Sequence, residues 1–133
     1  MTIKEYLDKI KDLKIDEIKV NLIEKQYSDD LPKNVKRLIS NCDKTIFFDS
    51  DNILRLLSFS EIMNAEKDLH VDFNSRSIIP LFDCGDNDFI VYNYKEANWA
   101  KFNIVDEVIF KTESNLEEMF WKQYPSISYE IEG

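Results

Sequence analysis

Two pairs of aspartates come closest to forming an enzymatic site in this sequence. Asp49 and Asp51 follow the apolar run 46–48, and Asp86 and Asp88 lie just before a second apolar run. Carboxylates of this kind could hold a magnesium ion, and one of them could attack a phosphate group as a nucleophile. The sequence therefore raises the hypothesis of a magnesium-dependent phosphatase.

The pattern resembles the acidic loops of haloacid-dehalogenase phosphatases, but three features argue against that activity. Asn52 and Ile53 replace the glycine and threonine expected after the first pair. The segment between the pairs indicates one helix, rather than the alternating strands and helices that would bring both loops to the same sheet edge. The second pair precedes a strand, as a hairpin turn does. We predict no enzymatic activity and keep the phosphatase as an alternative.

Three aspartates, Asp83, Asp86 and Asp88, also offer oxygen ligands of the kind that calcium binds. Their spacing departs from that of an EF-hand loop, and the closing glutamate is missing. The sequence favours a turn in which Gly85 has a positive φ angle. Because the chain has only two glycines, it has no glycine-rich phosphate loop. We predict no metal site and no cofactor.

The two cysteines and the single histidine match no catalytic or zinc motif. Cys42 and Cys84 lack the two-residue spacing of redox and zinc sites, and we interpret both as small buried apolar residues. His70 lies in a polar stretch with neither cysteine near it in the sequence. Distance along the chain does not exclude a Cys-His catalytic pair, but nothing supports one. We expect His70 at the surface.

The negative charge of the chain is concentrated in one part of it. Residues 1–42 carry nine basic and eight acidic groups, a net charge of +1, whereas residues 43–133 carry eight basic and eighteen acidic groups, a net charge of −10. Such a field repels phosphate backbones and anionic lipids, and it speeds association with a basic protein. We expect a protein partner and no nucleic acid or membrane. The alternative is that the surplus of acidic residues only keeps the protein soluble.

Several aromatic residues could stack on the bases of a nucleic acid, but no basic groove accompanies them. We interpret them as core or interface residues. They are Tyr92, Tyr94, Trp99, Phe102 and Trp121.

A chain of 133 residues with 44% hydrophobic residues has room for one domain with one core. Residues 1–14 alternate charged and apolar types and lack the unbroken apolar stretch of a signal peptide or a membrane span. We expect one cytoplasmic domain over residues 1–133. Nothing in the sequence indicates its oligomeric state.

Helical periodicity dominates the first third of the chain, and strand-like runs follow. Ser58–Glu61 and Ser114–Glu117 are capping boxes, each predicting a helix start. The expected helices cover residues 3–10, 15–27, 32–42, 58–63 and 114–124, and the expected strands cover 45–48, 53–57, 78–82, 89–92, 99–102 and 108–110. Strands in succession indicate an α+β fold: a mostly antiparallel sheet, with N-terminal helices and a C-terminal helix packed on it. The apolar run Phe89–Tyr92 predicts an inner strand.

Four segments of the chain resemble the SUKH superfamily, the group of bacterial domains similar to yeast cell-wall-assembly regulators. Their order and spacing carry the likeness, which covers residues 16–122. The segments are the leucine-proline helix Leu31–Leu38, the short helix start Leu57–Ile62, the central hairpin Ile78–Tyr92, and the last strand and helix Val108–Phe120. The chain departs from the family at residues 41–44, where Asn-Cys-Asp-Lys replaces a glycine pair.

The resemblance implies a non-enzymatic protein-binding domain, and in bacteria an immunity protein that neutralises a toxin, often a nuclease. It also allows a regulatory or scaffold module that binds a host protein. Because a basic nuclease attracts a polyanion, we expect a basic toxin domain as the partner. We place the partner-binding residues in the acidic turns and on one aromatic residue: Asp49, Asp51, Asp83, Asp86, Asp88 and Tyr94. The helical face at residues 33–37 is the alternative surface.

Overall fold

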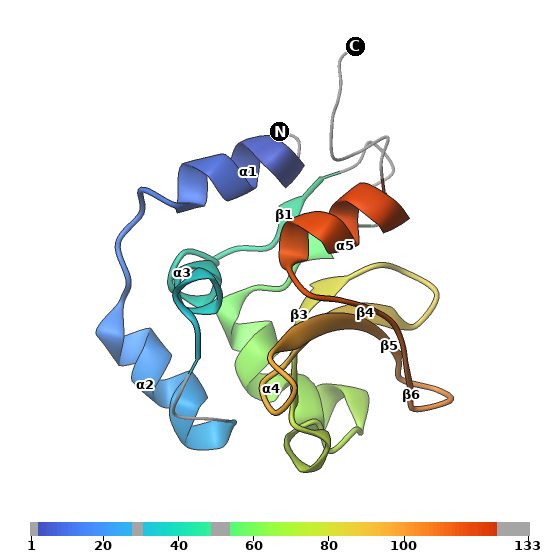
Figure 1. Cartoon of the computed structure of the whole chain (residues 1–133). Coiled ribbons are helices and arrows are strands. Elements are labelled where there is room, and N and C mark those ends of the chain that lie inside the picture. Colours follow the sequence, from blue (N-terminus) through green and yellow to red (C-terminus); the bar gives the residue numbers. More distant parts are fainter. Residues whose placement is uncertain (1–2, 28–30, 49–53, 125–133) are drawn as a thin grey trace.

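The computed structural model describes residues 3–27, 31–48 and 54–124, which form five helices and a six-stranded antiparallel sheet (Figure 1). The helices are α1 (Ile3–Ile10), α2 (Glu17–Gln26), α3 (Lys33–Ser40), α4 (Phe59–Leu69) and α5 (Leu116–Gln123), with a short 3-10 helix at Asn74–Arg76. The strands are β1 (Ile46–Phe47), β2 (Arg55–Leu56), β3 (Ile78–Asp83), β4 (Asp88–Asn93), β5 (Asn98–Asn103) and β6 (Val108–Glu113). The predicted α+β class is confirmed.

The six strands follow one another across the sheet in chain order, each antiparallel to its neighbours. β4 therefore pairs on both sides, and Phe89–Tyr92 is buried along its whole length. This confirms the predicted inner strand. β1 and β2 pair as expected but are only two residues long each, and the turn predicted at residues 49–52 lies outside the described residues.

Packing covers both faces of the sheet. Residues that pair directly across antiparallel strands project from the same side, so the register puts Phe82 on one face and Phe102 on the other. α5 packs on the first face, where the Phe120 ring lies 5.1 Å from the Phe82 ring. Phe73, which follows α4, packs on the second face with its ring 5.8 Å from that of Phe102. Figure 1 shows α5 and α4 on opposite sides of the curved sheet.

Helix α4 begins as predicted and ends later than predicted. The Ser58 side chain accepts from the Glu61 amide, and the Glu61 carboxylate accepts from the Ser58 amide at 3.0 Å, which completes the capping box. The helix does not fade at residue 64, because Ala65 continues its buried stripe. It ends at Leu69, and His70 follows with a left-handed φ of 58°.

Helix α5 begins one residue later than the capping box at Ser114 predicts. Asn115 is the N-cap, and its side-chain oxygen accepts from the Glu118 amide at 2.8 Å. A carbonyl oxygen on a short side chain caps as well as a hydroxyl does, so the neighbouring Asn takes the position. The prediction of Ser114 as the cap was wrong.

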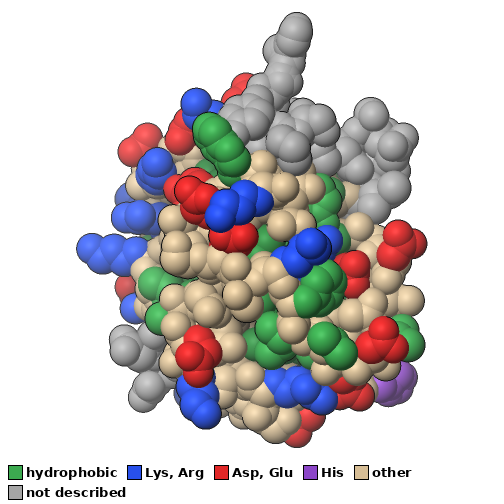
Figure 2. Space-filling model, turned by 45° about the vertical axis from the view of Figure 1, so that its right-hand side comes forward, with side chains coloured by type: hydrophobic (Ala, Val, Ile, Leu, Met, Phe, Trp, Pro, Cys, Tyr) green, Lys and Arg blue, Asp and Glu red, His purple; other side chains and the backbone are tan. Residues whose placement is uncertain are grey.

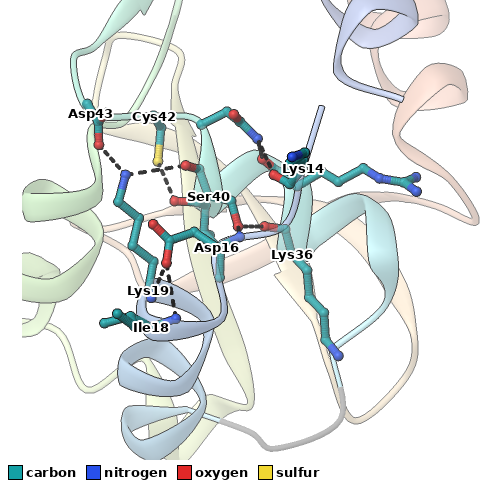
Figure 3. Close-up of polar contacts among 11 residues, drawn as sticks. Lys14, Asp16, Ile18, Lys19, Lys36, Ser40, Cys42 and Asp43 are labelled. Carbon is teal, nitrogen blue, oxygen red and sulfur yellow. Dashed lines mark hydrogen bonds and ion pairs between the residues drawn. The ribbon is translucent and has the colours of Figure 1, made fainter. Parts of the chain in front are cut away.

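A polar junction fixes the start of α2 to the end of α3 (Figure 3). The Asp16 side chain caps α2 by accepting from the amides of Ile18 and Lys19, and the Asp16 amide donates to Ser40 Oγ at 2.8 Å. Lys19 Nζ donates to the Ser40 carbonyl at 3.3 Å and pairs with Asp43. A cation at the carbonyl end of α3 complements the helix dipole.

The chain turns after α3 without the glycine pair of the SUKH family. Asn41 ends the helix at φ −122°, outside the left-handed region that favours glycine. Its side-chain amide donates to the carbonyls of Lys14 and Arg37, at 3.3 and 2.9 Å. The Cys42 carbonyl then accepts from the Phe59 amide at 2.7 Å, which ties this turn to the start of α4.

The last two hairpin turns share one design. Asn93 and Asn103 each accept hydrogen bonds from the amides two and three residues further on. Each turn then passes through a left-handed residue, Ala97 at φ 56° or Glu107 at φ 54°. An Asn side chain that accepts from the amide two residues further on favours a reversal of the chain.

β6 forms one edge of the sheet and carries an irregularity. Its pairing with β5 shifts register between Trp99 and Lys101, because three steps along β6 match two along β5. Lys111 lies in the shifted stretch with a left-handed φ of 51°. β6 therefore has a β-bulge in its C-terminal half.

Candidate partner-binding surface

The turn between β3 and β4 contains three of the six residues predicted for the partner-binding surface. The Asp88 amide donates to the Gly85 carbonyl at 2.9 Å, and the two residues between them, Asp86 and Asn87, have φ angles of 53° and 66°. Two left-handed central residues are typical of a type I′ hairpin turn. Gly85 has a φ of 80°, as the sequence predicts.

Asp83 is compensated inside the fold. Its carboxylate lies 3.3 Å from Arg55 Nη2 and also accepts from the Gly85 amide. Arg55 Nη1 contacts the Glu61 carboxylate at 2.8 Å, so one guanidinium joins β2, β3 and the start of α4. The hydrogen bond between Arg55 and Glu61 raises the pKa of Arg55 and lowers the pKa of Glu61. We infer that Asp83 has a structural role.

Asp86 and Asp88 differ in how far they are available to a partner. Asp88 is half-buried, and its carboxylate accepts from the Asn103 side-chain amide at 2.8 Å. Asp86 is exposed at the tip of the turn. None of the ion pairs formed within the described parts of the chain includes either residue.

A second acidic turn, missed by the sequence analysis, lies beside the first. Asp88 pairs with Asn103, and the Ile104 amide donates to the Asn87 carbonyl at 3.0 Å, so the β5–β6 turn adjoins the β3–β4 turn. That second turn contains Asp106, which is exposed, and Glu107, which pairs with Arg76 at 2.7 Å. Alternate turns of an antiparallel meander lie at the same end of the sheet. This rule could have predicted that Asp106 and Glu107 lie near the β3–β4 turn.

We call the described acidic residues of these two turns the acidic end of the sheet: Asp83, Asp86, Asp88, Asp106 and Glu107. Figure 1 shows both turns on the right-hand side, away from α2. Figure 2 brings that side forward and shows acidic side chains beside exposed apolar ones. Val105 and Val108, in and next to the second turn, are 68% and 50% exposed. A partner here would meet carboxylates and two apolar side chains together.

The other three predicted residues do not join this surface in the described structure. Tyr94 follows the far end of β4, about 20 Å from Asp88 at ~3.4 Å per residue. It is half-buried, and its hydroxyl donates to the Asn74 carbonyl at 3.1 Å. Asp49 and Asp51 lie outside the described residues.

Most of the aromatic residues considered for base stacking are buried. Tyr92, Trp99 and Phe102 are at most 7% exposed, and the Tyr92 and Trp99 rings pack edge to face at 5.2 Å. They belong to the core, and the sequence predicted that these residues lie in the core or at an interface. Trp121, on α5, is 61% exposed. It borders a hollow of about 170 Å³ between α1 and α5, together with Leu7.

Both cysteines are held in the protonated thiol form. Burial raises the pKa of the Cys42 thiol to about 12 and that of Cys84 to about 11, so both thiols are protonated at neutral pH. Cys42 is buried, as predicted, whereas Cys84 is half-buried; His70 is exposed, as predicted. Within residues 3–27, 31–48 and 54–124, no three histidine, cysteine or acidic side chains could together hold a metal ion.

Two further observations concern membrane-spanning helices and similarity to other proteins. No helix in the described part of the chain has the length and apolar character needed to cross a bilayer. No known family model, no characterised protein and no solved structure matches this chain.

Proposed function

We propose that this chain is a non-enzymatic protein-binding domain of the SUKH type, and that it acts as a bacterial immunity protein which neutralises a basic toxin domain. The observation that carries the proposal is the acidic end of the sheet. Two adjacent turns present Asp86 and Asp106 to solvent, and neither takes part in an ion pair among the described residues. Repulsion between such carboxylates falls when a cationic partner binds.

The arrangement of the carboxylates suits a partner that recognises a polyanion. A nuclease binds the phosphates of nucleic acid through lysine and arginine side chains. A row of carboxylates on rigid hairpin turns can meet the same side chains and cover the catalytic cleft. Val105 and Val108 add the apolar contact that the centre of a protein interface needs.

The family part of the proposal is supported by the order of the elements. The resemblance implies helices, then a central antiparallel hairpin in a sheet, then a last strand and helix. Helices α1 to α3, the β3–β4 hairpin, and β6 with α5 follow in that order. The departure at residues 41–44 is compatible with the turn, because Asn41 makes it without a left-handed angle.

The proposed lack of catalysis is supported by the surroundings of the acidic residues. Asp83 is paired with Arg55, and Asp86 lies in a tight hairpin turn. The sheet is antiparallel, whereas the phosphatase alternative requires alternating strands and helices that bring two loops to one sheet edge. Magnesium-dependent hydrolysis of a phosphoester by the wild type, lost in Asp49→Asn, would establish the alternative.

The proposal predicts a toxin gene directly upstream of this gene, and the deciding experiment measures association with the C-terminal domain of that toxin. Asp86→Asn with Asp106→Asn removes two charges, and Asn tolerates the left-handed angle at residue 86. We expect a slower on-rate and a weaker dependence of that rate on salt. The matched control, Asp12→Asn with Glu96→Gln, also removes two exposed charges, but after α1 and in the turn at the other end of the sheet.

Two outcomes would count against this function. On-rates that fall equally in both double variants would show that only net charge matters and that the acidic end is not the interface. A gene that stands alone, together with a host protein that co-purifies from the native cell, would favour the regulatory or scaffold module.

A further inference from the structure

The outer side of α2 exposes two large apolar side chains one helical turn apart. Ile18 is 75% exposed and Leu22 is 42% exposed, while Val20 and Ile23 on the opposite side are buried in the core. Residues four apart lie above one another on a helix, so the two exposed side chains form one stripe. Burying them would remove apolar surface from water, which favours association.

One side of α2 faces α4. Lys19 and Gln26 lie on the side of α2 that faces α4: the Lys19 amine is 5.7 Å from the Phe59 ring, and the Gln26 amide donates to the Met63 carbonyl at 3.1 Å. Phe59 and Met63 are half-buried. Lys19 and Gln26 therefore hold α2 against α4, and the stripe of Ile18 and Leu22 remains exposed.

The charges on α2 are balanced, unlike those of the acidic end. The helix has two acidic and two basic residues, and two of them are engaged within the fold: Lys19 with Asp43, and Glu24 with Lys36 at 4.0 Å. The other two, Glu17 in the first turn and Lys25 in the last, are exposed and belong to no ion pair that the described residues form. This surface offers a strongly basic partner no net attraction.

We propose that the outer face of α2 binds a second copy of this chain, with the two α2 helices packed antiparallel about a twofold axis. In a twofold contact, if a residue of one copy contacts a second residue of the other copy, the reverse contact also forms. Ile18 of each copy therefore packs on Leu22 of the other. The same operation brings Glu17 of each copy toward Lys25 of the other. A helix with opposite charges at its two ends is self-complementary only in this antiparallel orientation.

The proposed dimer is weak and leaves the acidic end free. A helix of ten residues is about 15 Å long, so the contact is smaller than the interfaces of stable complexes. Dimerisation should therefore depend on protein concentration. Figure 1 shows α2 on the side of the molecule opposite the β3–β4 and β5–β6 turns, so each copy would present its acidic end outward.

Sedimentation velocity over a hundredfold range of protein concentration tests the proposal. We expect the mean mass of the wild type to rise toward that of a dimer at the highest concentrations. Ile18→Glu should abolish the rise. Lys25→Glu should weaken association at least tenfold, because Glu17 of each copy then faces a second carboxylate instead of an amine. The charge swap Glu17→Lys with Lys25→Glu should restore association.

One control variant and two contrary results complete the test of the dimer. Val105→Glu places the same new charge on an exposed apolar residue at the far end of the molecule and should leave dimerisation unchanged. A wild type that remains monomeric throughout the range overturns the proposal. Equal loss of association in Lys25→Glu and in the charge swap also overturns it, because only the antiparallel pairing predicts rescue.

Discussion

The carboxylates at one end of the sheet fall into two groups that differ in their partners. Asp83 and Glu61 share Arg55 and fasten α4 to the sheet, whereas Asp86 and Asp106 are exposed on the two adjoining turns. The first group is held by a cation of the same chain, and the second is left for solvent or another molecule. Acidity alone therefore does not distinguish these carboxylates; the pairing of each charge does.

The largest effect that this comparison predicts comes from removing the shared cation. Arg55→Met should lower the free energy of unfolding by about 2 kcal/mol, because two half-buried carboxylates lose their charged hydrogen-bond donor. Urea denaturation measures the loss. Lys95→Met removes an exposed lysine elsewhere and should be nearly neutral. Equal stability of the two variants would contradict the structural role of Arg55.

Buried tyrosines allow the same comparison of paired and unpaired groups in the core. The Tyr27 hydroxyl donates to the Ile62 carbonyl at 3.2 Å, whereas the buried Tyr6 hydroxyl has no hydrogen-bond partner among the described residues. Tyr27→Phe should lower the free energy of unfolding by about 1 kcal/mol, and Tyr6→Phe should leave it unchanged or raise it by about 1 kcal/mol. Thermal unfolding measures both, and a shift in the same direction in the two variants would refute the contrast.

Low pH should reduce the stability that the Arg55–Glu61 ion pair contributes. The hydrogen bond from Arg55 lowers the pKa of Glu61 from its usual value of 4.5, so the stability that Glu61 contributes is complete above pH 4.5 and is lost as the pH falls through the lowered pKa. Because the side chain is 39% exposed, the effect is small. Glu61→Gln should flatten the stability profile below pH 4.5, as measured by urea titrations at several pH values. An unchanged acid slope would show that other carboxylates account for it.

The exposed group should give the smallest effect on stability. Asp86→Asn with Asp106→Asn removes charges that form no ion pair among the described residues, so the free energy of unfolding should change by less than about 0.5 kcal/mol. Chemical denaturation measures it. A loss comparable to that of Arg55→Met would show that these carboxylates also hold the fold.

Local sequence patterns identified the type and order of the elements, because those depend on neighbours in the chain. The capping box at Ser58, the positive φ of Gly85 and the inner strand Phe89–Tyr92 are all confirmed. The start of α5 was misplaced because Ser114 and Asn115 are both good caps, and residue type alone does not choose between them.

The candidate surface was less predictable, because it depends on residues far apart in the sequence. Arg55 lies 28 positions from Asp83, and nothing local shows that this aspartate is paired. Asp106 was missed because only the register of the sheet brings its turn beside Asp86. Tyr94 was included for its chemistry, although β4 carries it to the other end.

The bulge in β6 has a consequence for how the protein behaves at high concentration. An outer strand with regular, unpaired backbone groups can template the strand of another molecule and so begin an aggregate. In β6 the left-handed Lys111 interrupts that regularity halfway along, and its side chain is exposed. The sheet edge therefore resists growth by strand addition, which lets neighbouring molecules meet through side chains without polymerising through their backbones.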